Sequence, residues 1–405
     1  MVLLARVRIP TCLLLYLISM SKIYLDNAAS TPIRQEVIQV MNDVLKNYIG
    51  NPSSSHQFGR RNKALIERSR ISIASSIHAL PSEIIFTSGG TEANNLVLRS
   101  AIRDLKVKRI LSSPIEHKSV LDTILDIARC SKIVIELIKL EEKGSIDRED
   151  LERKLKNNSI TTIVSLMHAN NEIGNISDLE EIGFICKKYG SYFHSDIVQT
   201  VGHFPINVKN IPLDFAVASA HKFYGPLGIG FVFIRKGLLV NPFLTGGGQE
   251  KNLRAGTENI CGIVGMTKAL ELAYSSLNEE KGKIETLKKY CISELKREIP
   301  EIKFNGFSDF LDKSLYTILN ISIPIKNNIL SFFLDLKGIA VSLGSACASS
   351  YVRRSHVIEA VSGKDPSSYL RISFGIFNKM KDIDAFIEAL IEIKKNIGKT
   401  FWVKI

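Results

Sequence analysis

Short apolar segments alternate with helical stretches between Arg34 and Ile234. The apolar segments have the composition of buried strands, and the stretches between them, such as 91–102 and 118–129, carry apolar residues at helical spacing. Strands separated by helices of this length form a mainly parallel sheet that is covered on both faces. The sequence therefore predicts an α/β fold with a seven-stranded sheet, whose strands are expected at 83–87, 109–113, 132–138, 161–167, 191–196, 213–220 and 228–234.

The pattern changes after about Asn259. A long helical region is followed by strand-like residues at 314–323, and the chain closes with an amphipathic helix. One face of that helix carries Ile383, Phe386, Ile387, Leu390, Ile391 and Ile397. A chain of 405 residues has room for two domains. We predict a large domain over residues 31–275 and a smaller α+β domain built from residues 21–30 and 276–405.

The N-terminal stretch MVLLARVRIPTCLLLYLISM has arginines ahead of an apolar run. The run is too short to span a bilayer. Met20 stands directly before SKIYLDNAAS, where the globular pattern begins. Residues 1–20 are therefore interpreted as an N-terminal extension, either upstream of the true start or a targeting segment. We expect a cytoplasmic protein in the first case and an organellar one in the second.

Charge and cysteine content limit the partners and the compartment. The formal net charge is +12, but the basic residues are scattered and 45% of the residues are hydrophobic. This favours an ordinary globular protein over one that binds nucleic acid directly or a membrane. The six cysteines are widely spaced and form no C-x-x-C pair, which argues against a zinc site and a disulfide scaffold. A reducing compartment is expected.

Polar residues follow several of the predicted strands, at the edge where sheets of this kind bind ligands. The turn Ser88–Thr91 opens a helix, so its backbone N–H groups can hold an anion, with a plain helix cap as the alternative. Asp196 ends another strand and Gln199 follows it; here a capping aspartate is the alternative. Other strand ends carry His117, His168, Asn170 and Asn171. Together they indicate one polar rim.

Lys222 lies at a further strand end, in SAHKFYGPLGIG. A buried lysine is costly unless it has a partner. An amine near a carboxylate and an anion-holding turn meets the needs of pyridoxal phosphate. The lysine forms a Schiff base with the aldehyde, the acid keeps the pyridine nitrogen protonated, and the turn takes the phosphate. The glycines after Lys222 would let the chain approach this cofactor closely.

Two more candidates lie in the second half of the chain. Cys347 is surrounded by small residues in VSLGSACASS, a composition typical of an exposed loop in which a thiolate can attack; an ordinary loop thiol is the alternative. Arg371 lies on the polar face of a strand whose other face carries Leu370 and Ile372. A guanidinium held in this way suits capture of a substrate carboxylate, and a surface salt bridge is the alternative.

These motifs together resemble the cysteine desulfurases, in the class V, fold type I branch of the pyridoxal-phosphate-dependent enzymes. The resemblance runs from about Ile23 to Ile397 with the motifs in family order: YLDNAAST, GNPSSSHQFG, TSGGTEANN, EHKSVLD, HANNEIG, HSDIVQ, SAHKFYGPLGIG, GGGQE, LRAGTEN, GSAC and LRISFG. It implies a fold type I transferase, in which a large domain binds the cofactor and the smaller one carries the loop with the catalytic cysteine.

The resemblance also implies roles for single residues. Lys222, His117 and Cys347 would be catalytic: Lys222 moves the α-proton, His117 accepts a proton from a thiol, and Cys347 receives the sulfur. Asn171 and Arg371 would hold the substrate carboxylate. Thr257 would reach the cofactor of the other subunit in a homodimer. The implied cofactor-binding residues are Gly90, Thr91, His117, Asn171, Asp196, Gln199, Ser219, His221, Lys222 and Thr257.

The implied reaction removes sulfur from L-cysteine, leaving L-alanine and a persulfide on Cys347. Iron–sulfur cluster assembly, through a scaffold protein, and tRNA thiolation are the implied destinations of the sulfur. No resident metal is expected; the resemblance implies only that Cys347 transiently ligates an iron–sulfur cluster. Arg353 and Arg354 stand where relatives tend to carry an acid and a proline, and the chain stops soon after the last helix, so the acceptor contact is expected to differ.

Other readings stay open at this point. A selenocysteine lyase, a cysteine sulfinate desulfinase or an aminotransferase would keep the cofactor and change the reaction; only Cys347 and its loop separate them from a desulfurase. A basic protein that binds RNA or a partner, with a decayed active site, would hold no cofactor and would be colourless.

Overall fold

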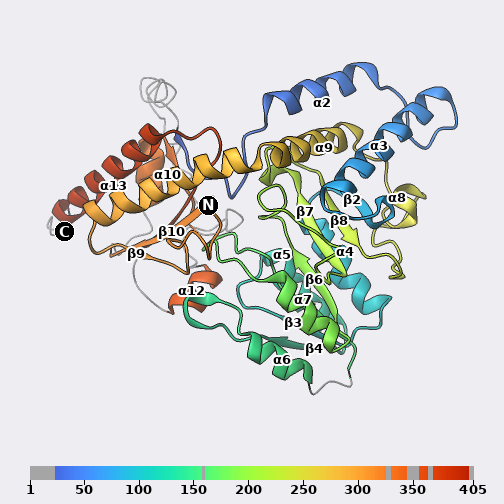
Figure 1. Ribbon diagram of the computed structural model, residues 1–405, viewed down its shortest axis with the longest axis horizontal. Helices are drawn as coiled ribbons and strands as arrows, with labels where there is room; N and C mark the ends of the chain where they lie inside the picture. The colour runs from blue at the N-terminus through green and yellow to red at the C-terminus, as the bar shows by residue number, and fades with distance from the viewer. Residues whose placement is uncertain (1–22, 157–159, 325–329, 344–354, 364–367, 401–405) are drawn as a thin grey trace, which may run out of the picture.

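The computed structural model describes residues 23–156, 160–324, 330–343, 355–363 and 368–400, and the side chains as far as residue 396. Its larger part is organised around a seven-stranded sheet with the strand order β2-β8-β7-β6-β5-β3-β4 (Figure 1). Neighbouring strands are parallel except at β8, which is antiparallel to both β2 and β7. The strands are β2 (Ile84–Thr87), β3 (Arg109–Ser112), β4 (Val134–Leu137), β5 (Thr162–Ser165), β6 (Tyr192–Asp196), β7 (Phe215–Ser219) and β8 (Gly230–Ile234).

Helices cover both faces of this sheet, as expected for parallel strands joined by helical crossovers. One face packs against α4 (Gly90–Arg103) and α5 (Lys118–Cys130). The helices that contribute to the core on the other face are α2 (Gln35–Asn47), α3 (Gln57–Ser76), α6 (Arg148–Lys156), α7 (Leu179–Lys188) and α9 (Ile260–Ser275). A short helix, α8 (Gln249–Asn252), lies between β8 and α9 in the chain.

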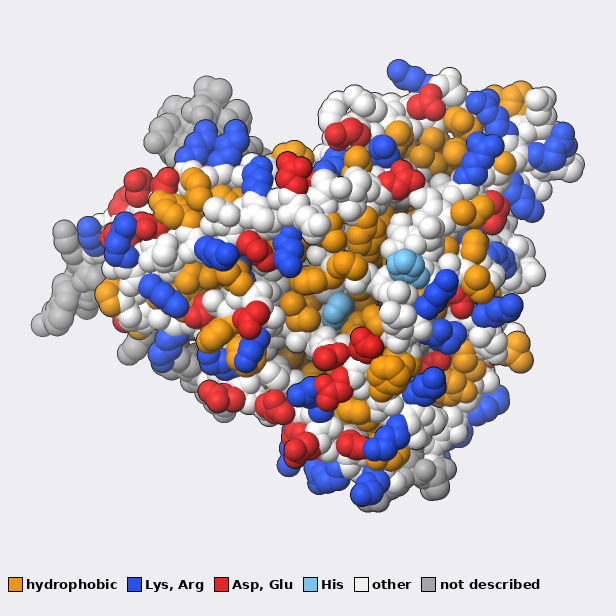
Figure 2. Space-filling view, in the orientation of Figure 1, with side chains coloured by type: hydrophobic (Ala, Val, Ile, Leu, Met, Phe, Trp, Pro, Cys, Tyr) orange, Lys and Arg blue, Asp and Glu red, His pale blue; other side chains and the backbone are white. Residues whose placement is uncertain are grey.

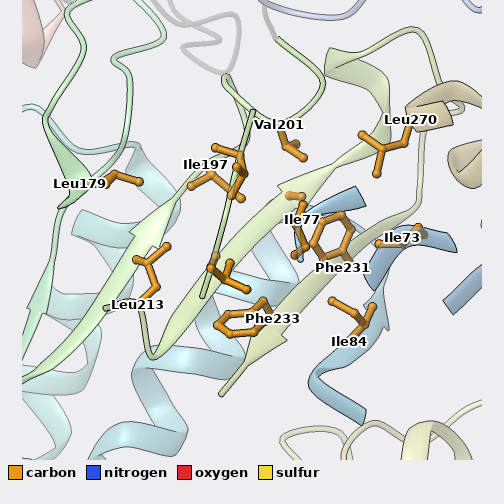
Figure 3. Close-up of a cluster of buried hydrophobic side chains, with 14 of the residues drawn as sticks. Ile73, Ile77, Ile84, Leu179, Ile197, Val201, Leu213, Phe231, Phe233 and Leu270 are labelled. Carbon is orange, nitrogen blue, oxygen red and sulfur yellow. The ribbon is translucent and has the colours of Figure 1, made fainter. Parts of the chain in front are cut away.

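The core on the α3 and α9 face is built from side chains of β2, β3, β5, β6, β7 and β8 and of the covering helices. Figure 3 shows Phe231 and Phe233 of β8 between Ile73 of α3 and Leu213, with Ile84 beside them. Both faces of β8 are buried, which explains why its sequence is a continuous apolar run instead of an alternating one.

The second part contains a three-stranded antiparallel sheet, β12-β10-β9, and a parallel pair formed by β1 and β11. Its strands are β1 (Ile23–Tyr24), β9 (Lys303–Phe304), β10 (Ile318–Ile323), β11 (Ile339–Ala340) and β12 (Ser368–Ser373). Its helices are α10 (Leu277–Glu298), α11 (Leu330–Leu336), α12 (His356–Ser362) and α13 (Met380–Thr400). The predicted face of α13 packs here through Ile383, Phe386, Ile387, Leu390 and Ile391; Ile397 lies outside the described side chains.

The observed architecture agrees with the predicted one in its sheet, and the long helical region predicted after Asn259 is two helices, α9 and α10, separated at Ser276. The predicted domain limits stay predictions, and residues 1–20 lie outside the described residues. Basic and acidic side chains are interspersed over the face that Figure 2 shows. Within the described ranges, no helix has both the length and the apolar character needed to cross a membrane.

Candidate active site

A cavity of about 160 Å³ lies where β3, β5, β6 and β7 reach their carboxyl ends. The start of α4, the segment after β1 and one residue of β12 complete its wall. Parallel strands end at the same edge of a sheet, so residues that are far apart in the sequence meet here. The predicted site residues that line this cavity are Gly90, Thr91, His117, Asn171, Asp196, Gln199, Ser219, His221, Lys222 and Arg371.

Lys222 is presented by a tight helical turn, η3 (Ala220–Lys222), directly after β7. Its Nζ donates hydrogen bonds to the backbone carbonyls of Ala28 and Ala29, each at 2.7 Å. The backbone carbonyl of Lys222 itself accepts a hydrogen bond from Nε2 of His203 at 3.0 Å. These contacts fix both ends of the residue, so the amine is held in the wall of the cavity.

The glycines around Lys222 are required by close packing. A Cβ on Gly230 would lie 2.3 Å from the carbonyl oxygen of Ala218 and 2.9 Å from Cα of Gly89. A Cβ on Gly225 would lie 2.9 Å from that of Ala220, in the turn that presents Lys222. Glycine at position 230 therefore lets β8 approach both β7 and the turn before α4, and glycine at position 225 leaves room for Ala220.

A hydrogen-bonded chain joins Asp196 to His117. Asn94 of α4 donates from its amide nitrogen to Oδ2 of Asp196 and to Oγ of Ser119, both at 2.8 Å. Nδ1 of His117 lies 2.7 Å from Oγ of Ser119 and accepts the backbone N–H of Ser119 at 3.1 Å. Oδ1 of Asp196 accepts the backbone N–H of Val198 at 3.0 Å. Both carboxylate oxygens are thus engaged, and Nδ1 of His117 is fixed as an acceptor.

Burial lowers the pKa of both histidines at the cavity. Burial lowers the pKa of His117, and the nearby Lys222 lowers it further, while Asp196 opposes the shift. Since Nδ1 of His117 accepts hydrogen bonds, its neutral ring carries the proton on Nε2. Burial, together with Lys222, lowers the pKa of His221 to about 4. Nδ1 of His221 is buried without a hydrogen-bond partner in the described structure.

The turn before α4 is open for an anion. Gly89 precedes the helix at a φ of 151°, and no side chain caps the helix there. Glu92 in the first turn is engaged elsewhere: it accepts hydrogen bonds from Arg254 and from the backbone of Ser88, both at 2.8 Å. Burial favours the neutral acid, but these hydrogen bonds outweigh it and lower the pKa of Glu92. Gly90 and Thr91, the first residues of α4, line the cavity, where the N–H groups and dipole of a helix N-terminus favour an anion.

Arg371 of β12 is buried at the cavity and is 1% exposed. One terminal nitrogen donates to Oδ1 of Asp26 and the other to the carbonyl oxygen of Asn171, each at 2.8 Å. Its Nε is buried and has no hydrogen-bond partner in the described structure. A buried guanidinium with an unused donor in the wall of a cavity is suited to an anionic ligand group.

Three residues singled out in the sequence, Thr257, His168 and Asn170, do not line this cavity. Thr257 lies in the segment between α8 and α9, where its side chain is exposed and does not line the cavity. His168 lies beneath the rim, with Nδ1 2.8 Å from Oγ1 of Thr200, and burial lowers its pKa to about 4. Cys347 lies outside the described residues, so its predicted place at the site stays a prediction. Asn170 has a structural role, since its Oδ1 accepts the backbone N–H groups of Glu172 and Ile173.

Sequence reasoning missed Asn94 and Ser119, which line the cavity, and Asp26, which pairs with Arg371 in its wall. Asn94 lies about one turn after Gly90, on the face of α4 that meets the sheet, so helical spacing from the glycine turn is a signal that could have found it. No local signal points to Asp26, because its partner Arg371 is far away in the sequence.

The residues present fit pyridoxal phosphate. Lys222 supplies an amine, Asp196 a carboxylate held by two N–H donors, and Gly90 begins an uncapped helix at the same cavity. The unpartnered Nδ1 of buried His221 offers a further polar contact. In the described part of the chain, no group of three or more His, Cys, Asp or Glu residues is placed to hold a metal ion. Fold and site together define a fold type I pyridoxal-phosphate-dependent enzyme.

The aminotransferase class-V family profile matches residues 23–386. A cysteine desulfurase IscS of Dictyoglomus turgidum is 40% identical over 377 residues, 92% of this chain and 94% of the relative. One from Methanosarcina thermophila is 38% identical and covers 93% of this chain and 92% of the relative. Among solved structures, a NifS-like protein from Rickettsia africae superposes with a TM-score of 0.83 at 34% identity, over 93% of this chain and all of that one. The structure of SspA in complex with cysteine has a TM-score of 0.73 at 28% identity, over 89% of this chain and all of that one.

The chain belongs to the class-V aminotransferase family, among its cysteine desulfurases. The predicted family, fold class, enzymatic activity and cofactor are therefore confirmed.

Proposed function

We propose that Lys222, Asp196 and Arg371 of this cysteine desulfurase act together on L-cysteine, and that Cys347 receives its sulfur. The observation that carries the proposal is the convergence of an amine, a held carboxylate and a buried guanidinium in one cavity. Membership of the cysteine desulfurases supports the reaction, and the relative solved in complex with cysteine supports the substrate.

The cofactor would be held by the residues described above. The N–H groups at Gly90 and Thr91, with Ser219 and His221, would take the phosphate, and Asp196 would pair with the pyridine nitrogen. The neutral ring of His117 would lie against the cofactor face, and Gln199 would contact the phenolic oxygen. When bound, pyridoxal phosphate supplies an electron sink that loosens the bonds at the α and β carbons of an amino acid.

The substrate steps are assigned to residues of this chain. Arg371 and Asn171 would bind the carboxylate of L-cysteine and so orient its α-hydrogen toward Lys222, whose Nζ takes and later returns that proton. The thiolate of Cys347 attacks the substrate sulfur, so a sulfur–sulfur bond forms as the carbon–sulfur bond breaks. The proton that Cys347 loses is the one gained at the β carbon. L-Cysteine and a thiol thus give L-alanine and a persulfide, with no external oxidant or reductant.

The experiment that tests this function is a single turnover. Purified protein is incubated with L-cysteine, alanine is measured, and the persulfide is located by mass spectrometry of peptides. We expect one alanine per active site and a mass gain on Cys347; Cys347→Ala should form no persulfide and Lys222→Ala no alanine. A Cys347→Ala protein that yields alanine and sulfide at the full rate would contradict the role of Cys347. Turnover of L-selenocysteine under the same conditions separates a lyase preference from a desulfurase.

The assembly and the destination of the sulfur are part of the proposal. Thr257 is exposed, as expected of a residue that serves the site of a second copy in a homodimer. Mixing Lys222→Ala and Thr257→Ala proteins and measuring the activity of the hybrid tests whether Thr257 serves the site of the other subunit.

We propose that an iron–sulfur scaffold protein accepts the sulfur in the cytoplasm, and that delivery for tRNA thiolation is a further route. Persulfide transfer from loaded protein to a purified scaffold, and cell fractionation, test these points.

A further inference from the structure

Helix α12 begins with an unusually well-connected cap. Oγ of Ser355 accepts the backbone N–H groups of Val357 and Ile358 at 3.0 and 3.4 Å. The same hydroxyl donates to Oε2 of Glu172 at 2.5 Å, and the backbone N–H of Ser355 donates to the hydroxyl of Tyr369 at 2.7 Å. A helix cap needs only the first kind of contact. The contact with Glu172 connects α12 to the segment after β5.

The two segments that are hydrogen-bonded to the start of α12 also carry the cavity residues Asn171 and His117. Glu172 is 1% exposed and directly follows Asn171 in the sequence. Nε2 of His356 lies 2.9 Å from the carbonyl oxygen of Glu116, which directly precedes His117. The first turn of α12 is therefore hydrogen-bonded next to both Asn171 and His117.

The segment before Cys347 is also hydrogen-bonded to a cavity residue. Ser342 and Arg371 exchange backbone hydrogen bonds, at 2.8 Å to the oxygen of Ser342 and 3.2 Å to that of Arg371. In the sequence, Cys347 lies between Ser342 and Ser355. Both described flanks of the stretch that contains Cys347 are thus tied to residues in or beside the cavity.

We propose that Ser355 and Glu172 are positioning residues for sulfur transfer to Cys347. The proposal rests on the proposed function. Fixing both flanks of a chain segment restricts the volume that its residues can sample, which raises the effective concentration of a nucleophile at its target. The hydroxyl–carboxylate bond suits this task because it is charge-assisted and Glu172 is buried.

A single variant and a double variant distinguish the positioning role of Ser355 and Glu172 from simple helix capping. Ser355→Asp keeps a good helix cap but places a second carboxylate against Glu172. We expect kcat for alanine formation to fall at least about tenfold, since small misplacements of reacting groups cost this much or more. The KM for L-cysteine and the visible absorption band of the bound cofactor should not change. Adding Glu172→Gln, whose amide can donate to the new carboxylate, should restore most of kcat.

Asp178→Ala is the matched control, since Oδ1 of Asp178 caps α7 by accepting the backbone N–H of Glu181 at 3.0 Å. It should keep its kcat. Wild-type protein that forms no alanine from L-cysteine would contradict the proposed function. With active wild-type protein, an unchanged kcat in Ser355→Asp, or no restoration in the double variant, would overturn the positioning role. Loss of the cofactor absorption band, or a large drop in Tm, in Ser355→Asp would also overturn the positioning role, because the contact would then serve stability.

Discussion

The side-chain amide of Asn94 lies 2.8 Å from Oδ2 of Asp196, and both residues are buried. Asn94 is therefore the link between helix α4, which carries the anion-holding turn, and the carboxylate at the end of β6. It also donates to Ser119, next to His117. The amide of Asn94 therefore connects three parts of the cavity wall: the start of α4, the end of β6 and the segment that carries His117.

Replacing Asn94 with leucine should weaken cofactor retention. The change removes a donor from a buried carboxylate, at a cost of about 1–3 kcal/mol, which corresponds to roughly five- to 150-fold in cofactor affinity. The measurement is the cofactor absorption that remains after dialysis against graded cofactor concentrations. Asn47→Ala is the control, because Asn47 is an exposed amide on α2 whose nitrogen donates to Asp43 of the same helix, away from the cavity. Equal retention by Asn94→Leu and wild type would contradict the link.

Gly230→Ala should lower both stability and cofactor binding. Its Cβ would lie 2.3 Å from the carbonyl oxygen of Ala218, so β7 and β8 must separate; overpacking of this kind costs about 1–3 kcal/mol. Thermal unfolding and cofactor absorption measure the two effects. Gly282→Ala is the matched control in α10, where nothing lies within 4 Å of the added Cβ. It should stabilise the protein by about 0.5–1 kcal/mol.

Glu250→Ala should destabilise the protein strongly. Arg70 and Glu250 form a bidentate ion pair with both nitrogen–oxygen distances at 2.7 Å, and their side chains are 2% and 1% exposed. Removing one partner leaves a buried charge, which costs about 3–5 kcal/mol. Denaturant unfolding checks the value. Glu152→Ala, which breaks an exposed pair with Lys188, should leave the unfolding midpoint unchanged; an equal effect of the two variants would count against the argument from burial.

Because Lys288 is buried, we expect the free energy of unfolding to depend on pH. Burial lowers its pKa to about 7, and its Nζ donates to Oγ of Ser314 and to the carbonyl of Leu315. The unfolded chain holds the lysine proton up to a pKa of about 10.4, so between these values unfolding takes up a proton. The charged Lys288 therefore lowers the free energy of unfolding by its full amount below about pH 7, and this penalty disappears as the pH rises toward about 10.4. Lys288→Met should therefore be more stable than wild type at pH 6, and this advantage should shrink steadily up to pH 10. Unfolding free energies across this range test it; a constant difference would contradict it.

The sequence by itself determined the main part of the fold and most of the residues of the site. The apolar runs that became β2, β3, β5, β6, β7 and β8 are local patterns, and parallel strands joined by helices bring their carboxyl ends to one edge whatever the details of packing. Polar residues at those ends, such as Asp196 and Lys222, could therefore be placed at one cavity before the structure was known.

Tertiary structure alone decided which side chains contact one another there. The pairs Asn94–Asp196, Asp26–Arg371 and Ser355–Glu172 join residues that no local period relates, and each forms only when separate elements pack. Thr257 lies outside the cavity of its own chain, and its predicted contact with the cofactor of a second subunit stays a prediction. Local periodicity reports which way a side chain faces within its own element. The hydrogen bonds of the site depend on distances between elements, which are set by the packing of the two cores.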